Sequence, residues 1–163
     1  DVCRRLGIKQ PPHGIARGRL DAEEVLDKVG LPVVIRPSYV LGGRKMRVVY
    51  SYDELTSYLD DLYGDITEQD ITEVPLLIDR FLEAATEVDV DALYDGAELL
   101  VGGVMEHVEE AGVHSGDSAC VIPPVTIPQK HIETIRDYTR RIAVELNVIG
   151  LMNIQYAVKD HVL

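Results

Sequence analysis

Residues 87–103 read EVDVDALYDGAELLVGG, and this stretch decides the fold class that the sequence predicts. Apolar and acidic side chains alternate over residues 87–92, which is typical of a strand with one buried and one solvated face. A second apolar run follows Asp95 and Gly96. Asp-Gly between such runs predicts a hairpin with a type I′ turn, because both central residues of that turn need a positive φ. The stretch therefore predicts two antiparallel strands.

The segments on both sides of this hairpin predict helices and further strands. Capping-box spacings begin two helices, at Asp21 and at Ser51, and apolar residues at helical spacing follow each of them. Helices are expected at residues 21–30, 51–64 and 129–147, and strands at residues 31–35, 45–50, 75–79 and 151–158. The apolar face of the last helix is expected to comprise Ile132, Ile135, Tyr138, Ile142 and Leu146. Antiparallel strands with helices between them predict an α+β fold rather than a doubly wound parallel sheet.

The composition describes an acidic chain with enough apolar residues for a core. Of the 163 residues 46% are hydrophobic, and 28 acidic against 16 basic residues give a formal net charge of -12. Such a surface repels phosphate backbones, so the sequence argues against general nucleic-acid binding. An anionic ligand needs a local group of cations and backbone N–H groups. The sequence also argues against a membrane protein, because no apolar run approaches the ~20 residues of a membrane span.

The cysteines and the chain ends bear on where the protein works and how much of it is present. Cys3 and Cys120 are too few for a disulfide framework and lack the paired spacing of a zinc site. They indicate a reducing compartment, and the cytoplasm is the simplest localisation. The first residues, DVCRRL, do not include Met and read as the inside of a helix. We interpret the chain as a fragment that is incomplete at both ends.

Arg36 is the first candidate for binding chemistry. It follows a predicted strand and precedes PSYVLGG and Arg44. Glycines let backbone N–H groups approach a phosphate, and an arginine at a strand end supplies a bidentate cation. The alternative is an ordinary glycine hairpin turn beside a surface arginine, because short glycine motifs often match by accident.

Residues 106–120, EHVEEAGVHSGDSAC, form the second candidate, a loop rich in polar side chains after an apolar strand. Gly112 and Gly116 bracket three residues whose backbone amides are free to face a ligand. The alternative is a solvated loop in which His107 and His114 have no shared role. The spacing of these histidines fits no usual zinc pattern, so the sequence argues against a transition-metal site.

Polar residues on two strands make the third and fourth candidates. Glu87, Asp89 and Asp91 lie on one strand face by period 2. Such a row is usually the solvated face of a sheet, but one glutamate of the row is suited to hydrogen-bond ribose hydroxyls. Asn153 and Gln155 share a face of the apolar strand MNIQYAV. They are either amides satisfied within the fold or groups that orient a hydrated Mg²⁺ and its phosphates.

Four strings in order along the chain resemble one protein family. They are RPSYVLGG from Arg36, DRFLEAATEVDVDA from Asp79, GGVMEHVEEAGVHSGDSAC from Gly102 and GLMNIQYAVK from Gly150. Together they resemble the large subunit of carbamoyl-phosphate synthetase over nearly the whole chain. The resemblance is to its second ATP-grasp half, since the first half typically reads RPSFTMGG and GIHTGDS at the matching places.

The resemblance implies an ATP-grasp fold, in which two α+β subdomains with mostly antiparallel sheets close over ATP. Residues 1–80 would form the lid-like subdomain and residues 81–163 the first part of the larger one. The resemblance also implies an ATP-dependent ligase whose second half phosphorylates carbamate with MgATP, with Mn²⁺ as the alternative metal. Its product is carbamoyl phosphate for arginine and pyrimidine synthesis, and a small glutamine amidotransferase subunit is the implied partner.

At the matched positions the resemblance implies contacts with ATP and no catalytic side chain. Arg36 would contact the phosphates, Arg80 and Leu82 the adenine side, and Glu87 the ribose. The family often has His in place of Arg80, so that contact would rest on the backbone. Gln155 would contact the nucleotide as a ligand of Mg²⁺. The remaining residues that would line the nucleotide are Gly112, Val113, His114 and Ser115.

One departure from the family pattern concerns the metal. In the family, the strand after Gln155 turns and continues into an EVNPR-like motif that completes the metal site, whereas this sequence stops at Leu163. A lone Gln is a poor substitute for the carboxylates that Mg²⁺ prefers, so we expect the fragment to fold at least partly and to turn over no ATP. Two alternatives stay open. One is another ATP-grasp ligase, for example of the biotin carboxylase type, and the other is a non-catalytic module that binds nucleotide or docks a subunit.

Overall fold

A computed structural model describes residues 2–38, 45–63, 75–112 and 117–163 of the chain. The chain divides into two compact units. The N-terminal unit comprises Gln10–Phe81, and the C-terminal unit comprises Asp1–Lys9 together with Leu82–Leu163. The expected division near residue 80 placed residues 1–9 in the first piece, whereas these residues pack with the second unit. None of the helices in the described ranges has both the length and the apolar character needed to cross a membrane.

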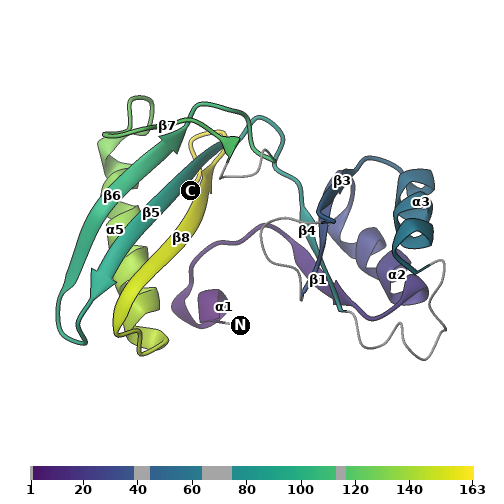
Figure 1. The fold of residues 1–163 in the computed structure, drawn as a ribbon, viewed down its shortest axis with the longest axis horizontal. Helices are drawn as coiled ribbons and strands as arrows, with labels where there is room; N and C mark the ends of the chain where they lie inside the picture. Colours follow the sequence, from purple (N-terminus) through teal and green to yellow (C-terminus); the bar gives the residue numbers. More distant parts are fainter. Residues whose placement is uncertain (1, 39–44, 64–74, 113–116) are drawn as a thin grey trace. The chain divides into compact units, whose positions relative to one another are not determined.

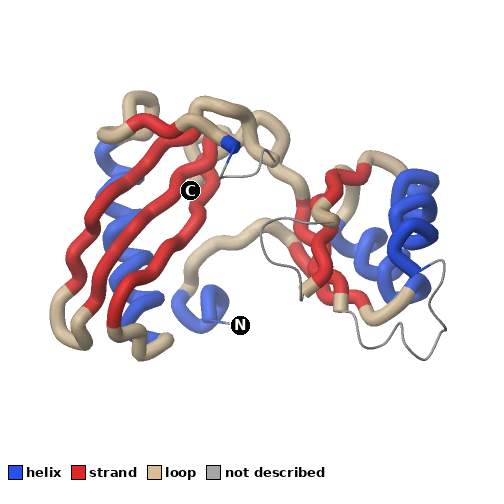
Figure 2. Tube along the Cα trace, in the orientation of Figure 1, coloured by secondary structure: helices blue, strands red, loops and turns tan. Residues whose placement is uncertain are grey.

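The N-terminal unit is a four-stranded antiparallel sheet with two helices on one face (Figures 1 and 2). Its strands, in sheet order, are β1 (His13–Ala16), β4 (Leu76–Arg80), β2 (Val33–Pro37) and β3 (Arg47–Val49). Its helices are α2 (Arg19–Val29) and α3 (Tyr52–Tyr63). Alternate strand residues such as Val33, Ile35 and Ile78 are buried against Leu26 and Leu59 of the helices. Because side chains alternate along a strand, the other sheet face carries apolar residues such as Val34 and Leu77 together with the charged Arg36 and Asp79.

The C-terminal unit is a second four-stranded antiparallel sheet, covered on one face by a long helix (Figure 1). Its strands, in sheet order, are β7 (Cys120–Val121), β6 (Leu99–His107), β5 (Thr86–Tyr94) and β8 (Gly150–Val158). Its helices include the short α1 (Val2–Leu6), which packs against the long α5 (Gln129–Glu145). The core of this unit is centred on Val88, Val90 and Ile135. The two antiparallel sheets with packed helices confirm the predicted α+β class.

The predicted hairpin is confirmed, but its turn is not of the predicted type. β5 and β6 pair antiparallel as far as Tyr94 and Leu99, so that four residues connect them. The Asp95 carboxylate accepts hydrogen bonds from the backbone N–H groups of Ala97 and Glu98, at 2.8 and 2.7 Å. An Asp side chain that satisfies backbone donors stabilises such a turn. The prediction of a type I′ turn centred on Asp95 and Gly96 is wrong, because Gly96 has a positive φ and Asp95 does not.

One of the two predicted helix starts is confirmed. Before α3, the Ser51 hydroxyl oxygen accepts a hydrogen bond from the N–H of Glu54 (3.2 Å), and the Glu54 carboxylate accepts one from the N–H of Tyr50 (2.8 Å). Asp21 as the cap of α2 is wrong, because Gly18 is the N-cap and Asp21 lies inside the first turn. An acidic side chain there still favours the helix, since it faces the positive end of the helix dipole.

Two strands and the last helix differ in detail from the prediction. β2 runs on to Pro37 and β4 to Arg80, so that Arg36 and Arg80 lie within strands rather than just past them. Leu146 lies beyond the end of α5 and is 54% exposed. Of the predicted apolar face of α5, Ile135 is buried and Ile132 is partly buried against the core, whereas the other buried residues of the helix are His131, Thr139 and Ala143.

Candidate functional site

The face of the N-terminal sheet that is turned away from its helices carries Arg36 and Asp79. Arg36 Nη2 lies 3.3 Å from Asp79 Oδ2, and His13 lies directly opposite Asp79 on the neighbouring strand. Burial raises the pKa of the Asp79 carboxyl above its ordinary value, and the charges of Arg36 and His13 oppose this shift without cancelling it. A carboxylate at a position that disfavours its charge is a candidate functional group.

Asp79→Asn is expected to raise the stability of the N-terminal unit at neutral pH. Because the pKa of Asp79 is raised in the folded chain, its ionised form costs stability at every pH above the folded pKa. That cost falls as the pH drops through the folded pKa, and it is absent below the ordinary value of 3.8. Thermal unfolding followed by circular dichroism, at about pH 7 and about pH 3, measures the effect.

The matched control for this change is Glu23→Gln, which removes one negative charge from an exposed position of α2 in the same unit. Asp79→Asn should be more stable than this control at about pH 7, and the difference should shrink toward about pH 3. A loss of stability in Asp79→Asn at neutral pH would show instead that the ion pair with Arg36 stabilises the fold by more than burial costs.

Arg80 lies on the helix-covered side of the N-terminal sheet. It is opposite Val33, whose side chain is buried, and a Cβ atom on Gly30 would lie 2.8 Å from Arg80 Nη1. Gly30 has a φ of +78° at the end of α2, so glycine suits this position both for its backbone and for the guanidinium beside it. The adenine contact that the resemblance implies for Arg80 would therefore use its backbone groups rather than its guanidinium. Leu82 is half-buried, and its adenine contact also stays a prediction.

The face of the C-terminal sheet that is turned away from α5, called the open face below, carries the acid row of β5. Glu87, Asp89 and Asp91 alternate with valines that pack toward α5. β8 places Gln155 opposite Asp89 and Asn153 opposite Asp91, and Asn153 Nδ2 donates to Asp91 Oδ1 at 2.9 Å. The interpretation of this row as a solvated face is wrong for Asp89, which is only 8% exposed.

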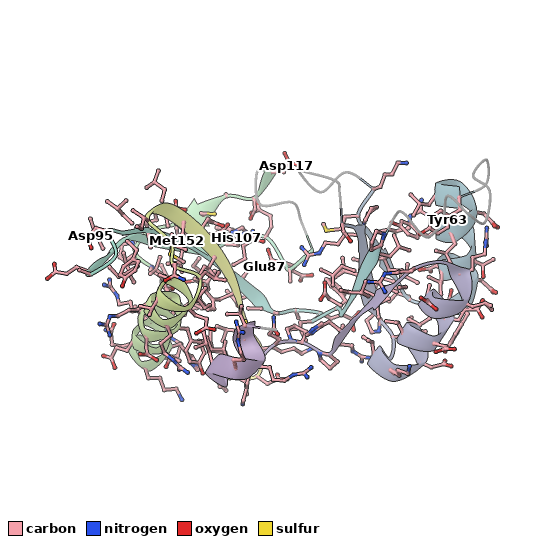
Figure 3. The ribbon with its side chains drawn as sticks, turned by 90° about the horizontal axis from the view of Figure 1, so that it is seen from below. Tyr63, Glu87, Asp95, His107, Asp117 and Met152 are labelled. Carbon is pink, nitrogen blue, oxygen red and sulfur yellow. The ribbon has the colours of Figure 1, made fainter. Side chains whose placement is uncertain are left out.

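His107 of β6 is the partner that compensates the burial of Asp89. His107 Nε2 lies 2.8 Å from Asp89 Oδ2, and His107 Nδ1 lies 3.9 Å from Glu87 Oε2. Figure 3 shows His107 and Glu87 side by side in this unit. The His107 side chain is 2% exposed, so both contacts are shielded from water. Asp89 Oδ1 is buried and has no hydrogen-bond partner within the described ranges.

Glu87 also reaches the loop that follows β6. Its Oε1 accepts a hydrogen bond of 3.3 Å from the N–H of Gly112, whose φ of +98° favours glycine. The Glu87 carboxylate therefore lies between His107 and the loop that the resemblance assigns to the nucleotide. The other expected residues of that loop, Val113, His114 and Ser115, lie outside the described residues, as do the glycine pair and Arg44 within residues 39–44.

Glu106, the neighbour of His107, points to the opposite side of the sheet and holds the loop before α5. Its carboxylate accepts hydrogen bonds from the N–H groups of Val125 (2.6 Å) and Thr126 (2.8 Å), and from Thr126 Oγ1 (2.5 Å). Burial raises the pKa of Glu106, but these hydrogen bonds outweigh burial, and the pKa lies below its ordinary value. A local anchor of this kind fixes the path of the chain into α5.

A cavity of about 420 Å³ lies beside this anchor. It is lined by residues 84–86 and 106–110 and by Val121, Val125 and Thr126. Three glutamates of the wall, Glu106, Glu109 and Glu110, make it unsuited to phosphate groups, because like charges repel in a partly buried site. Phosphate groups alone are therefore not expected to bind in this cavity.

Gln155 is the only expected metal ligand, and it is exposed on β8. In the described ranges, no group of three or more His, Cys, Asp or Glu side chains is arranged to hold a metal ion. One amide oxygen is a weak site for Mg²⁺, which prefers carboxylates and phosphates. The described residues thus do not fit a complete Mg²⁺ site, and Gln155 as a ligand stays a prediction.

The sequence did not point to Asp79, and it named Asp89 and His107 as candidates without predicting that they pair in a buried contact. The sequence pattern that could have indicated this pair is the alternation of side chains along a strand. It places Asp89 and His107 on strands that are expected to be neighbours, where side chains on the same face can meet. Which residues face each other depends on the register of β5 and β6, which shifts between Asp91 and Ala92. Sequence periodicity carries no information on that shift.

Comparison with known proteins decides the family. The family model described as "Carbamoyl-phosphate synthase L chain, ATP binding domain" matches residues 5–162. The chain belongs to this family. A carbamoyl phosphate synthase large chain from Methanothermobacter thermautotrophicus is 56% identical over 159 residues, which cover 98% of this chain and 14% of that protein. The chain thus spans about one seventh of that large chain.

A second relative and two solved structures add to this family assignment. The relative is a "Carbamoyl phosphate synthase large chain, C-terminal section" from Methanocaldococcus jannaschii, 52% identical over 99% of this chain and 25% of that protein. A biotin carboxylase domain of the Hydrogenobacter thermophilus 2-oxoglutarate carboxylase, with MgADP, has a TM-score of 0.77 at 17% identity, over 98% of this chain and 35% of that one. An N5-carboxyaminoimidazole ribonucleotide synthetase with ADP has a TM-score of 0.76 at 13% identity. The match covers 98% of this chain and 39% of the synthetase chain. These two structures confirm the predicted ATP-grasp fold.

Proposed function

We propose that this chain binds ATP for the phosphorylation of carbamate in a carbamoyl phosphate synthase large chain. The observation that carries the proposal is the match over 99% of the chain to a relative named as the C-terminal section of such a large chain. It supports the second half of the enzyme rather than the first. Synthesis of carbamoyl phosphate for arginine and pyrimidines, a cytoplasmic location and a small glutamine amidotransferase subunit as partner belong to the same proposal.

In this proposal two described side chains contact the nucleotide. Arg36 binds ATP phosphates, and its contact with Asp79 at 3.3 Å holds the guanidinium on the face turned away from the helices. Glu87 accepts hydrogen bonds from the ribose hydroxyls. Phosphoryl transfer depends mainly on such positioning and on neutralising charge. Mg²⁺, with Mn²⁺ as the alternative, would neutralise the phosphates beside Gln155.

The proposal is tested by grafting this sequence into the matching residues of the Methanocaldococcus jannaschii C-terminal section. The assay follows ATP formed from ADP and carbamoyl phosphate, which is the reverse of the proposed reaction. The graft should form ATP, and Glu87→Ala in the graft should raise the KM for ADP. A folded graft that forms no ATP would contradict the proposal. A ligase of the biotin carboxylase type acts on another acceptor and would form no ATP from carbamoyl phosphate. The assay therefore also distinguishes the proposed carbamoyl phosphate synthase from that alternative.

The ungrafted chain is expected to show no ATP hydrolysis above background. Its described residues offer no carboxylate set for Mg²⁺, and removal of such charge neutralisation costs several kcal/mol at the transition state, or about a thousandfold in rate. A phosphate-release assay with ATP and Mg²⁺ measures the rate, with the graft as the positive control. Hydrolysis by the chain at the rate of the graft would contradict this expectation.

A further inference from the structure

Four groups form a continuous series across the open face of the C-terminal sheet: Asp89, His107, Glu87 and the N–H of Gly112. We propose that His107 is a positioning residue that holds the Glu87 carboxylate for recognition of the ribose hydroxyls of a nucleotide. The inference rests on the proposed ATP binding and goes beyond it, because it assigns the ribose selectivity to a buried side chain that itself touches no ligand.

Asp89 fixes the orientation of the His107 ring. An ionised carboxylate only accepts hydrogen bonds, so Nε2 of His107 is the donor in the 2.8 Å contact with Asp89 Oδ2. The side chains of His107 and Asp89 are 2% and 11% exposed, so water does not compete for this bond. Charge-assisted hydrogen bonds that are shielded from water are strong. The imidazole therefore has one orientation, with Nδ1 toward Glu87.

The fixed ring in turn limits where the Glu87 carboxylate can lie. His107 Nδ1 is 3.9 Å from Glu87 Oε2, too long for a hydrogen bond, so the ring borders the carboxylate on one side without donating to it. Oε1 accepts the N–H of Gly112 at 3.3 Å. Each oxygen thus has a neighbour that restrains it, and the Glu87 side chain is still 28% exposed. Two carboxylate oxygens offer about four acceptor positions, so acceptors remain for two vicinal hydroxyls.

Nucleotides with and without ribose hydroxyls distinguish this positioning role of His107 from a merely structural one. If His107 only stabilised the fold, its removal would weaken the binding of every nucleotide by a similar factor. If His107 orients Glu87, its removal weakens only those nucleotides that carry ribose hydroxyls. The ratio of ATP affinity to 2′,3′-dideoxy-ATP affinity is therefore the quantity that tests the proposal, because both ligands share the base and the triphosphate.

The experiment measures both affinities by calorimetric titration for the unchanged chain and for His107→Phe. The unchanged chain should prefer ATP over 2′,3′-dideoxy-ATP by about 10- to 100-fold, which is the size of a lost charge-assisted hydrogen bond. In His107→Phe this preference should fall to about twofold or less, with little change in the affinity for dideoxy-ATP. A preference that survives in folded His107→Phe would overturn the proposal. Asp89→Asn, which keeps the shape of the side chain, should lower the preference partly.

The matched control is His131→Phe. His131 is another buried histidine of the same unit, 7% exposed on α5, on the other side of the sheet from Glu87. This change makes the same substitution at another buried position of the same unit but away from Glu87, so it should leave the preference for ATP unchanged. An equal loss of preference in His131→Phe and His107→Phe would show a general effect on the fold, and would overturn the assignment to His107.

A second readout needs no nucleotide and keeps the inference distinct from the proposed function. Amide hydrogen exchange at Gly112 reports whether Glu87 still accepts its N–H. Exchange at Gly112 should be about tenfold faster in His107→Phe and unchanged in His131→Phe. Equal exchange in all three chains would overturn the positioning role. If the unchanged chain binds no ATP, the proposed function is wrong, and so is the role of His107 in ribose recognition. The hydrogen-exchange rate at Gly112 would still report whether His107 positions Glu87.

Discussion

Arg36→Ala is expected to weaken ATP binding by about 10- to 100-fold, the effect of losing a charge-assisted hydrogen bond to phosphate. Arg36 lies on the face of the N-terminal sheet turned away from the helices, and its side chain is 53% exposed beside Asp79. The guanidinium is thus held but accessible. Calorimetric titration with ATP and with adenosine measures the effect. Adenosine affinity should not change, because adenosine has no phosphates for Arg36 to bind.

Arg47→Ala is the matched control for Arg36→Ala. It removes the same charge from the same sheet, but Arg47 lies over the Tyr58 ring on the helix-covered face and pairs with Asp61 at 3.0 Å. Arg36→Lys should recover only part of the affinity, since lysine keeps the charge but lacks the planar fork. Equal losses in Arg36→Ala and Arg47→Ala would mean that only the net charge matters, and the assignment of Arg36 would be wrong.

Glu106→Ala is expected to lower the free energy of unfolding of the C-terminal unit by about 2–4 kcal/mol, because it removes the charged acceptor that three donors share in part-buried hydrogen bonds. Those donors are the N–H groups of Val125 and Thr126 and the Thr126 hydroxyl. Glu106→Gln keeps the shape and should cost less. Urea unfolding followed by circular dichroism measures both changes.

The matched control for Glu106→Ala is Glu110→Ala, which removes the same group from an exposed position close by. It should change the free energy of unfolding by no more than about 0.5 kcal/mol, as is usual for surface positions. If Glu106→Ala were as mild as this control, the hydrogen bonds from residues 125 and 126 would not anchor the loop. The pKa of Glu106 is lowered in the folded chain, so its contribution is present at neutral pH and is lost as the pH falls through the folded pKa.

Much of the fold follows from periodicity, and the misses have specific physical causes. The 3.6-residue pattern of Leu55, Tyr58, Leu59 and Leu62 predicts the buried face of α3, and all four are buried. On α5 the buried face includes polar residues, which a search for apolar periodicity passes over. Thr139 is fully buried because its hydroxyl is bonded to the Ile135 carbonyl oxygen at 2.8 Å and to the Tyr156 hydroxyl at 3.0 Å.

The candidate site was predictable only where local motifs carry it. Arg36 and Glu87 stand in strings long enough to identify the family, so their assignment needs no three-dimensional information. Asp79 and His107 stand in the same strings, but their significance comes from burial and from partners on other strands. Cross-strand contacts depend on register, and register is fixed by packing of the whole sheet rather than by the local sequence.

We propose that this chain binds ATP through Arg36 and Glu87. The most direct test is calorimetric titration of ATP, with Mg²⁺ present, into the unchanged chain and into the double variant Arg36→Ala/Glu87→Ala. We predict saturable binding of one ATP by the unchanged chain and binding weaker by at least about 100-fold in the double variant, since two charge-assisted contacts are lost. No binding by the unchanged chain, or equal affinity in the two, would contradict the claim.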